Sequence, residues 1–366
     1  MLFNGIYKDK KVFLTGHTGF KGSWLLSWLN MAGADVMGYS LAPKPEHKLY
    51  GYIKGESFCH SFLHDILDYP ALEKCMMEFQ PDFVFHLAAQ PLVRHSYENP
   101  LETFNVNIMG TTHVLNAIRK ISKPCVAVIV TTDKVYHNQE RTIPYRETDR
   151  LGGYDPYSSS KACAELVIDA YRNSYFNATN FNEHKKTIVA ARAGNVIGGG
   201  DWAKDRIVPD IISALQNNEP VIVRNPQSVR PWQHVLEPLH AYLLLGQKLF
   251  ENPGVFHNEY NFGPEPSDCL PVETMVQEAI KVWQAGTYKI LKEKEGPHEA
   301  GLLTLDISRA KTDLHWRPVY NAVEAMDKTI SWYKACTGEN ALELIEENIE
   351  TFMIEYNQSV ATVHPA

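Results

Sequence analysis

The sequence predicts an α/β fold: a doubly wound parallel sheet of the Rossmann type with a smaller mixed α/β lobe. Short apolar runs alternate with helix-periodic segments up to residue 192, and a glycine-rich turn follows the first apolar run. Strands and helices that take turns form a parallel sheet with right-handed crossovers. Beyond residue 192 the alternation loosens. We expect one domain over residues 1–193, with return segments near 229–263, and a second lobe made mainly of residues 194–366.

Each expected element has a local signal. A short apolar run bounded by turn residues indicates a buried strand, and apolar residues three and four apart indicate a helix. The first strand covers 11–15, and a helix over 23–31 follows the glycine turn. The later elements are strand 34–41, helix 70–79, strand 82–86, helix 99–120, strand 125–131, helix 154–175, strand 187–192, helix 208–216 and helix 237–250. We expect the tail, 358–366, to be disordered.

Composition and charge exclude several classes of protein. The net charge of −8 and the absence of a run rich in Lys or Arg speak against binding to nucleic acid. No apolar run approaches the roughly 20 residues of a membrane span. The six cysteines form no CxxC pair, and the fifteen histidines include no HExxH motif. We expect a cytoplasmic protein with reduced thiols, no metal, and no nucleic-acid or membrane partner.

The glycine-rich turn is the first functional signal. Gly16, Gly19 and Gly22 follow the first strand and open the first helix, in a GxxGxxG spacing. Glycines let the backbone approach a pyrophosphate, and a helix amino terminus favours negative charge. An ordinary strand-to-helix turn has the same composition, but its place at the start of an α/β alternation favours a dinucleotide site.

Two features of this site leave questions open. The second strand ends Gly-Tyr-Ser-Leu at 38–41, with no carboxylate for an adenosine ribose, so NAD and NADP are not distinguished, and Lys44 or Lys48 could bind a 2′-phosphate. His17 brings a large side chain into a loop that favours small ones. It either weakens or gates cofactor binding, or it turns to solvent.

A second motif supplies acid and base groups. Tyr157 and Lys161 lie four residues apart, so they share a helix face, and a lysine ammonium beside a phenol lowers the phenol pKa. A YxxxK spacing is common by chance. Its weight comes from Thr132, at the carboxyl end of an expected strand, where open α/β sheets bind ligands.

The chain resembles the extended short-chain dehydrogenase/reductase family of nucleotide-sugar enzymes over nearly its whole length. The motifs are TGHTGFKG at 15–22, HDI at 64–66, HLAAQ at 86–90, Tyr157 with Lys161, and RAGNVIG at 192–198. The resemblance implies NAD as cofactor. It places the following residues at the cofactor: Gly16, His17, Gly19, Phe20, Gly22, Asp65, Ile66, Leu87, Ala88, Ala89, Tyr157 and Lys161.

Within that family, Thr132-Asp133-Lys134 resembles the Thr-Asp-Glu signature of the 4,6-dehydratases, with lysine in place of glutamate. The resemblance implies that Tyr157 takes the proton of the glucosyl 4-hydroxyl while Thr132 holds that oxygen. Elimination of water across C5 and C6 follows, with Asp133 as the acid. Lys134 is either the C5 base, which requires a lowered pKa, or only a partner that orients Asp133 or the sugar.

The lysine at 134, together with QPLVR at 90–94, is similar to the CDP-linked branch, which implies CDP-glucose as the substrate. By resemblance the substrate side consists of Arg94, Asn195, Arg206, Arg230 and His298. For Arg206 and His298 a solvated surface position is the alternative. Related enzymes dimerise through the helices expected here over 99–120 and 154–175, so we expect a homodimer or a dimer of dimers.

Three other functions compete with this one. A dehydratase for a dTDP- or GDP-linked hexose would show the same catalytic residues. A nucleotide-sugar 4-epimerase would use the same tyrosine but has no need of Asp133 and Lys134. A cofactor-sensing protein without chemistry predicts a missing tyrosine or lysine, whereas Tyr157 and Lys161 are both present.

Overall fold

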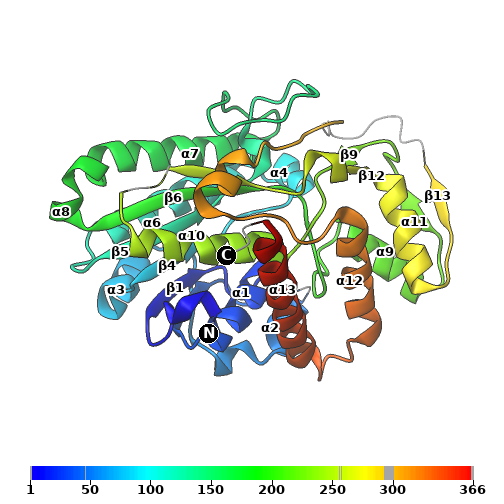
Figure 1. Cartoon of the computed structure of the whole chain (residues 1–366), viewed down its shortest axis with the longest axis horizontal. Coiled ribbons are helices and arrows are strands. Elements are labelled where there is room, and N and C mark those ends of the chain that lie inside the picture. Colours follow the sequence, from blue (N-terminus) through cyan, green and yellow to red (C-terminus); the bar gives the residue numbers. More distant parts are fainter. Residues whose placement is uncertain (1, 46, 255, 257, 292–300, 364–366) are drawn as a thin grey trace.

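The computed structural model describes residues 2–45, 47–254, 256, 258–291 and 301–363. A seven-stranded sheet forms its centre, and every strand pairs in parallel with its neighbours (Figure 1). The order across the sheet is β11-β6-β5-β4-β1-β2-β3. The strands are β1 Lys11–Thr15, β2 Asp35–Ser40, β3 His60–Leu63, β4 Phe83–His86, β5 Cys125–Val130, β6 Lys186–Ala193 and β11 Glu259–Phe262. The predicted doubly wound fold is confirmed.

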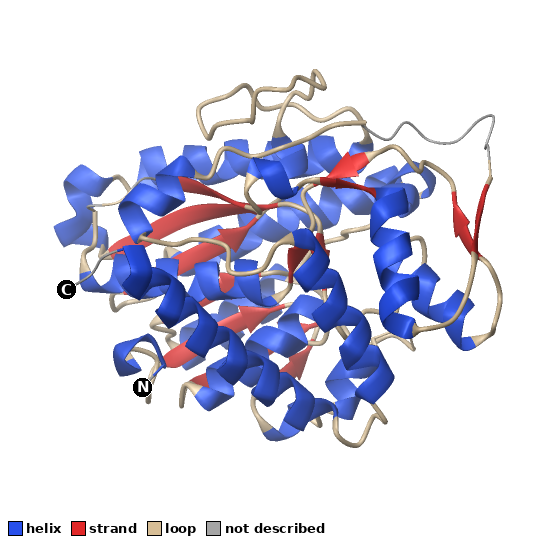
Figure 2. Ribbon diagram, turned by 45° about the vertical axis from the view of Figure 1, so that its right-hand side comes forward, coloured by secondary structure: helices blue, strands red, loops and turns tan. Residues whose placement is uncertain are grey.

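Helices cover both faces of this sheet (Figure 2). On one side pack α3 Tyr69–Phe79, α6 Gly110–Ile118 and α7 Pro156–Tyr175; on the other lie α1 Phe20–Met31, α10 Leu236–Glu251 and α13 Ala341–Val363. Alternate side chains of β1 enter the two cores: Val12 and Leu14 enter one, and Phe13 enters the other. Burial on both faces explains why these strands appear in the sequence as continuous apolar runs.

The smaller lobe combines short strands with the remaining helices. Its strands pair two by two, β7 with β10, β9 with β12 and β8 with β13. They are β7 Val196–Ile197, β8 Val221–Val223, β9 Val229–Arg230, β10 Gln233–His234, β12 Leu270–Pro271 and β13 Tyr288–Ile290. Its helices are α9 Ile207–Gln216, α11 Val272–Trp283 and α12 Ala322–Ala335. The chain returns to the large sheet through α10, β11 and α13, so a boundary near residue 193 remains our proposal.

Further short helices are α2 Lys48–Tyr52, α4 Val93–Glu98 and α8 Phe181–His184. The helix expected over 99–120 is α5 Pro100–Phe104, a π-helical turn Asn105–Met109, and α6. In that turn the Asn107 side chain accepts a hydrogen bond from the Gln90 N–H and donates to the Gln90 carbonyl.

The expectation of a disordered tail over 358–366 is wrong for 358–363, because α13 continues to Val363; residues 364–366 lie outside the described residues. Ile349, Phe352 and Tyr356 are buried against the body of the protein, and α13 packs on α1. The spacing of these apolar residues is that of a helix face. In the part of the chain that the structure describes, no helix is long and apolar enough to span a membrane. All six cysteines are free.

Candidate active site

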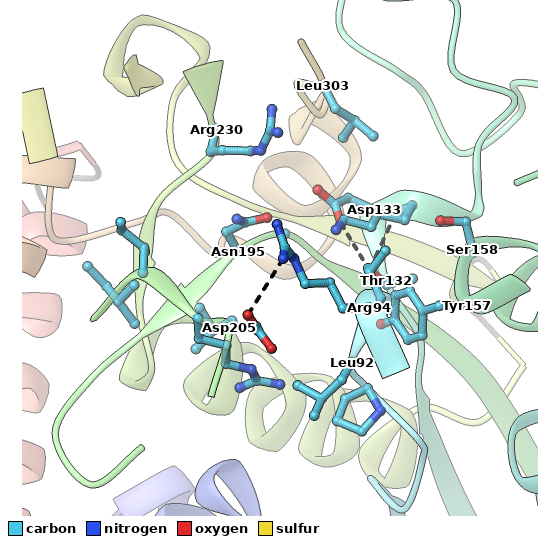
Figure 3. A pocket seen from close by; sticks show the side chains of 18 of the residues that line it. Leu92, Arg94, Thr132, Asp133, Tyr157, Ser158, Asn195, Asp205, Arg230 and Leu303 are labelled. Carbon is cyan, nitrogen blue, oxygen red and sulfur yellow. Dashed lines mark hydrogen bonds and ion pairs between the residues drawn. The ribbon is translucent and has the colours of Figure 1, made fainter. Parts of the chain in front are cut away.

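The candidate catalytic residues meet at the carboxyl ends of the central strands, where open α/β sheets bind ligands. Thr132 follows β5 and caps a single turn, Asp133–Val135, and Tyr157 lies in the first turn of α7. Asp155 caps α7 by accepting the Ser158 N–H. These elements line one pocket of about 780 Å³ that also receives side chains from the lobe (Figure 3).

The glycine turn forms a close-packed cradle at the start of α1. Gly16 has a φ of +76°, and a Cβ there would lie 2.9 Å from the Ala88 nitrogen. A Cβ on Gly22 would lie 2.0 Å from the Gly16 oxygen. Gly19 precedes α1 and no side chain caps that helix end. The cradle therefore brings bare backbone to a helix amino terminus, which fits a dinucleotide pyrophosphate.

A buried threonine connects this cradle to the next strand. The Thr15 hydroxyl oxygen accepts hydrogen bonds from the N–H groups of Leu87 and Ala88. His86 bonds to the same hydroxyl at 2.7 Å, and burial lowers the pKa of His86 to about 3, so its ring is neutral. Three of the expected cofactor positions, Gly16, Leu87 and Ala88, thus lie together.

His17 is fully buried, which contradicts its alternative position in solvent. Its Nε2 lies 2.8 Å from the Ser61 hydroxyl, and its ring packs edge-on against Tyr50. A Cβ on Gly38 would lie 2.5 Å from the ring. Burial lowers the pKa of His17 to about 4. The imidazole is a neutral wedge between the cradle and β2, and an effect on cofactor binding stays a hypothesis.

Most of the other residues expected at the cofactor lie outside the close-packed glycine turn. The Asp65 carboxylate accepts the Leu67 N–H and its carbonyl accepts the Tyr39 hydroxyl. Ile66 packs over Gly110 in the core, Ala89 is half-buried, and Phe20 lines the pocket. Lys48 lies over the Trp202 ring at 5.8 Å.

Burial is the largest influence on the pKa values of Asp133 and Tyr157. The Thr132 hydroxyl donates to the Asp133 carboxyl at 2.9 Å, and burial raises the pKa of Asp133 above its usual range. Burial also raises the pKa of Tyr157 to about 12, although Thr132 and Arg206 act in the opposite direction. The expected lowering of the tyrosine pKa is therefore not met here, because burial outweighs the hydrogen bond with Thr132 and the charge of Arg206. Asp133 is suited to hold a proton.

The two candidate lysines occupy different environments. Lys161 is buried behind the pocket, its Nζ donates to the Val130 carbonyl, and burial lowers its pKa to about 8. Lys134 is partly buried, lines the pocket and lowers the pKa of Asp133. Both of its predicted roles, base and partner of Asp133, remain open.

Lys21 is a pocket residue that the sequence reasoning missed. It lies over the Tyr242 ring at 5.7 Å, and burial lowers its pKa to about 7, with Lys161 and Arg206 adding repulsion. A lysine inside the glycine turn, between Phe20 and Gly22, was the available signal.

A buried ion pair supports the back of the site. Arg192 on β6 forms two hydrogen bonds of 3.0 Å to the Glu165 carboxylate on α7. Glu165 also accepts the hydroxyl of Thr131, next to Thr132, and raises the pKa of Lys161, one turn before it. The pair connects the strand end that carries Thr132 to the helix that carries Tyr157.

The lobe side of the pocket is cationic. Arg94, Asn195, Arg206 and Arg230 all line it, as expected. Arg206 is no solvated surface residue, because it donates to Asp201 at 2.8 Å. His298 lies outside the described residues. Arg224 and Asp205, which the sequence reasoning did not select, lie in the same wall. Among the described residues no group of three His, Cys, Asp or Glu side chains could hold a metal ion.

Residues 13–329 match the family model described as GDP-mannose 4,6 dehydratase, so the chain belongs to this family of nucleotide-sugar enzymes. The resemblance seen in the motifs is confirmed. The chain is 44% identical to CDP-glucose 4,6-dehydratase of Salmonella typhimurium over 354 residues, which are 96% of this chain and 99% of the relative.

Two solved structures share the fold. The dTDP-glucose 4,6-dehydratase from Bacillus anthracis in complex with NAD has a TM-score of 0.74 at 18% identity, over 91% of this chain and 99% of that one. The UDP-glucose 4-epimerase from Thermotoga maritima with UDP-glucose has a TM-score of 0.74 at 21% identity, over 88% of this chain and 98% of that one. At such identities the likeness shows the fold alone.

Proposed function

We propose that this protein converts CDP-glucose into CDP-4-keto-6-deoxyglucose and water. The observation that carries the proposal is the shared pocket of Thr132, Asp133, Lys134 and Tyr157. A dehydration needs an acid and a base beyond the tyrosine that oxidation at C4 requires. The 44% identity to a CDP-glucose 4,6-dehydratase over 96% of the chain supports the same substrate.

NAD fits the cradle at Gly16, Gly19 and Gly22, and when bound it supplies a reversible two-electron acceptor for C4 and donor for C6. The uncapped start of α1 favours the pyrophosphate. We propose that Asp65, Ile66 and residues 87–89 complete this site.

Tyr157 is the proposed base at the glucosyl 4-hydroxyl. Its hydrogen bond with Thr132 orients the phenol and lowers its pKa, against the larger effect of burial. Lys161 adds a group that can exchange a proton near neutral pH. The resulting 4-ketone acidifies the C5 proton, which makes elimination across C5 and C6 possible.

Asp133 is the proposed acid for the departing 6-hydroxyl, because burial keeps its carboxyl protonated to higher pH. Lys134 is the proposed base at C5 or the partner of Asp133. Solvent deuterium incorporation at C5 in Lys134→Met separates the two roles. A base predicts that exchange is lost, whereas exchange near the normal rate leaves only the partner role. Lys204→Met, an exposed lysine of the same pocket, is the matched control.

The substrate assignment is tested by incubating the pure protein with CDP-, dTDP-, UDP- and GDP-hexoses and measuring 4-keto product. We expect product from CDP-glucose. We propose that Arg94, Asn195, Arg206, Arg230 and His298 bind this substrate. Conversion of a dTDP- or GDP-linked hexose in its place would overturn the nucleotide assignment, and recovery of a 4-epimer would overturn the reaction.

We also propose assembly through the helices near 99–120 and 154–175, as a dimer or a dimer of dimers. Apolar side chains are exposed along them: Leu101, Met109, Leu166 and Tyr175. Sedimentation of the protein and of Leu166→Glu tests this surface. A monomeric parent protein would contradict it.

A further inference from the structure

Two pocket arginines from different parts of the fold share one carboxylate. Asp205 Oδ1 lies 3.9 Å from Arg94 Nη1 and 3.5 Å from Arg224 Nη1. Arg94 belongs to α4, after a strand of the large sheet, whereas Arg224 directly follows β8 of the lobe. Figure 3 shows the Asp205 carboxylate facing Arg94 inside the pocket. The bridge therefore lies in the lining of the pocket that a nucleotide sugar would enter.

A carboxylate and a phosphate present similar oxygens to a guanidinium. Arginine binds both through charge-assisted hydrogen bonds, often in pairs. All three bridging residues line the pocket, next to Arg206 and Arg230. A diphosphate that enters carries the charge that Asp205 now supplies to Arg94 and Arg224.

We propose that Asp205 is an internal competitor for the diphosphate of the substrate, and that Arg224 is a further substrate-binding residue. The carboxylate holds Arg94 and Arg224 until the phosphates of a nucleotide take its place. The inference rests on the proposed function only in requiring a phosphorylated ligand. Its consequence is a lowered affinity for every such ligand, product included, which hastens release.

Asp205 is well placed to be displaced. Its side chain is 45% exposed, so the carboxylate can return to water at little cost. Ion pairs this exposed contribute only about 0.2 to 1 kcal/mol each. The neighbouring Arg206 is held separately by Asp201, whose N–H and carbonyl both bond to the Tyr333 hydroxyl. Movement of Asp205 therefore leaves the rest of this loop anchored.

Calorimetric titration with CDP tests the competition without any turnover. Asp205→Asn keeps the side-chain shape and the left-handed backbone, since Asn tolerates the φ of +62° found there. We expect CDP to bind about fivefold more tightly to Asp205→Asn, from two weak ion pairs removed. Cytidine, which has no phosphate, should bind with unchanged affinity. Glu219→Gln, an exposed carboxylate beyond α9, should change neither.

A double-mutant cycle shows whether Arg224 carries the effect. Arg224→Gln should weaken CDP binding about tenfold, as expected for the loss of a charged hydrogen bond, and in that background Asp205→Asn should tighten it less than twofold. The inference is overturned if Asp205→Asn leaves CDP affinity unchanged, or tightens cytidine equally. A protein that converts CDP-glucose yet shows no such change contradicts this inference alone. One that shows the change but converts no CDP-glucose contradicts the proposed function alone.

Discussion

The two walls of the pocket differ in the charge state of their side chains. The reaction wall is formed by Lys21, Thr132, Asp133 and Tyr157, with Lys161 buried behind it. Burial shifts the ionisable groups here toward their neutral forms. The binding wall, formed by Arg94, Arg206, Arg224 and Arg230, is partly exposed and carries permanent charges beside Asp201 and Asp205. Proton transfer needs groups that gain and lose protons easily, whereas recognition of a diphosphate needs charges that persist.

The largest expected effect is on the reaction wall. Tyr157→Phe removes the phenol but keeps the ring, so we expect turnover of CDP-glucose to fall by about 10³-fold while CDP affinity stays the same. Initial rates of 4-keto product and a CDP titration measure the two separately. Tyr175→Phe, exposed on the same helix, should match the parent protein. A large loss of CDP affinity in Tyr157→Phe would show that the reaction wall also binds the nucleotide, which contradicts the proposed division.

A smaller effect, on the stability of the fold, is expected from the buried ion pair between Glu165 and Arg192 behind the reaction wall. Glu165→Gln leaves Arg192 buried without its counter-charge, so we expect the free energy of unfolding to fall by about 3 kcal/mol. Urea denaturation measures it. Glu183→Gln, exposed on α8, is the control. The double variant Glu165→Gln with Arg192→Met should recover part of the loss, because no buried charge is left. An unchanged free energy of unfolding in Glu165→Gln would show that the ion pair does not stabilise this part of the site.

Substitutions in the binding wall should change the KM for CDP-glucose rather than kcat. Arg230→Gln removes a permanent charge that also lowers the pKa of Asp133. We expect the KM for CDP-glucose to rise about tenfold, from one charged hydrogen bond, while kcat changes by less than threefold. Steady-state kinetics provide both numbers. A variant with normal KM and a collapsed kcat would place Arg230 in the chemistry instead.

The last effect is a pH dependence of stability. It tests whether burial alone can shift a pKa, as we infer for the groups of the reaction wall. Glu237, remote in the lobe-facing core, accepts the N–H groups of Val319 and Tyr320, and burial raises its pKa to about 8. Its folded pKa exceeds the unfolded one, so its stabilisation is complete below pH 4.5 and is lost as pH rises to about 8. We expect the free energy of unfolding to fall over that window by up to about 1.4 kcal/mol for each pH unit. Unfolding of Glu237→Gln should lack it, with Glu350→Gln as the control. An identical pH dependence in Glu237→Gln would assign the loss to other groups.

The sequence predicted the reaction wall better than the binding wall. The glycine turn, Thr132 and Tyr157 sit on elements whose period and burial are visible in short windows, and parallel strands bring their ends to one edge. Asp205 and Arg224 are brought together only by the fold of the lobe, so no local pattern pointed to them. Lys21 lies inside the motif and was overlooked, because its importance comes from its burial against the Tyr242 ring.

Three other differences between the prediction and the structure have separate causes. β3 was not predicted, because it is an edge strand whose side chains are largely exposed. The buried position of His17 depends on a cavity formed by Gly38, Ser61 and Tyr50 from three different segments. The tail was misjudged although Ile349, Phe352 and Tyr356 carried the helical spacing.

The position of α13 has a consequence for synthesis. The helix packs on α1, which begins at the glycine cradle, although more than 300 residues separate them in the chain. The last strand of the sheet, β11, also comes after β7, β8, β9 and β10 of the lobe. A growing chain on the ribosome therefore cannot finish its amino-terminal half early. That half awaits segments translated near the end, and until then the apolar back of α1 is a surface that a chaperone would cover.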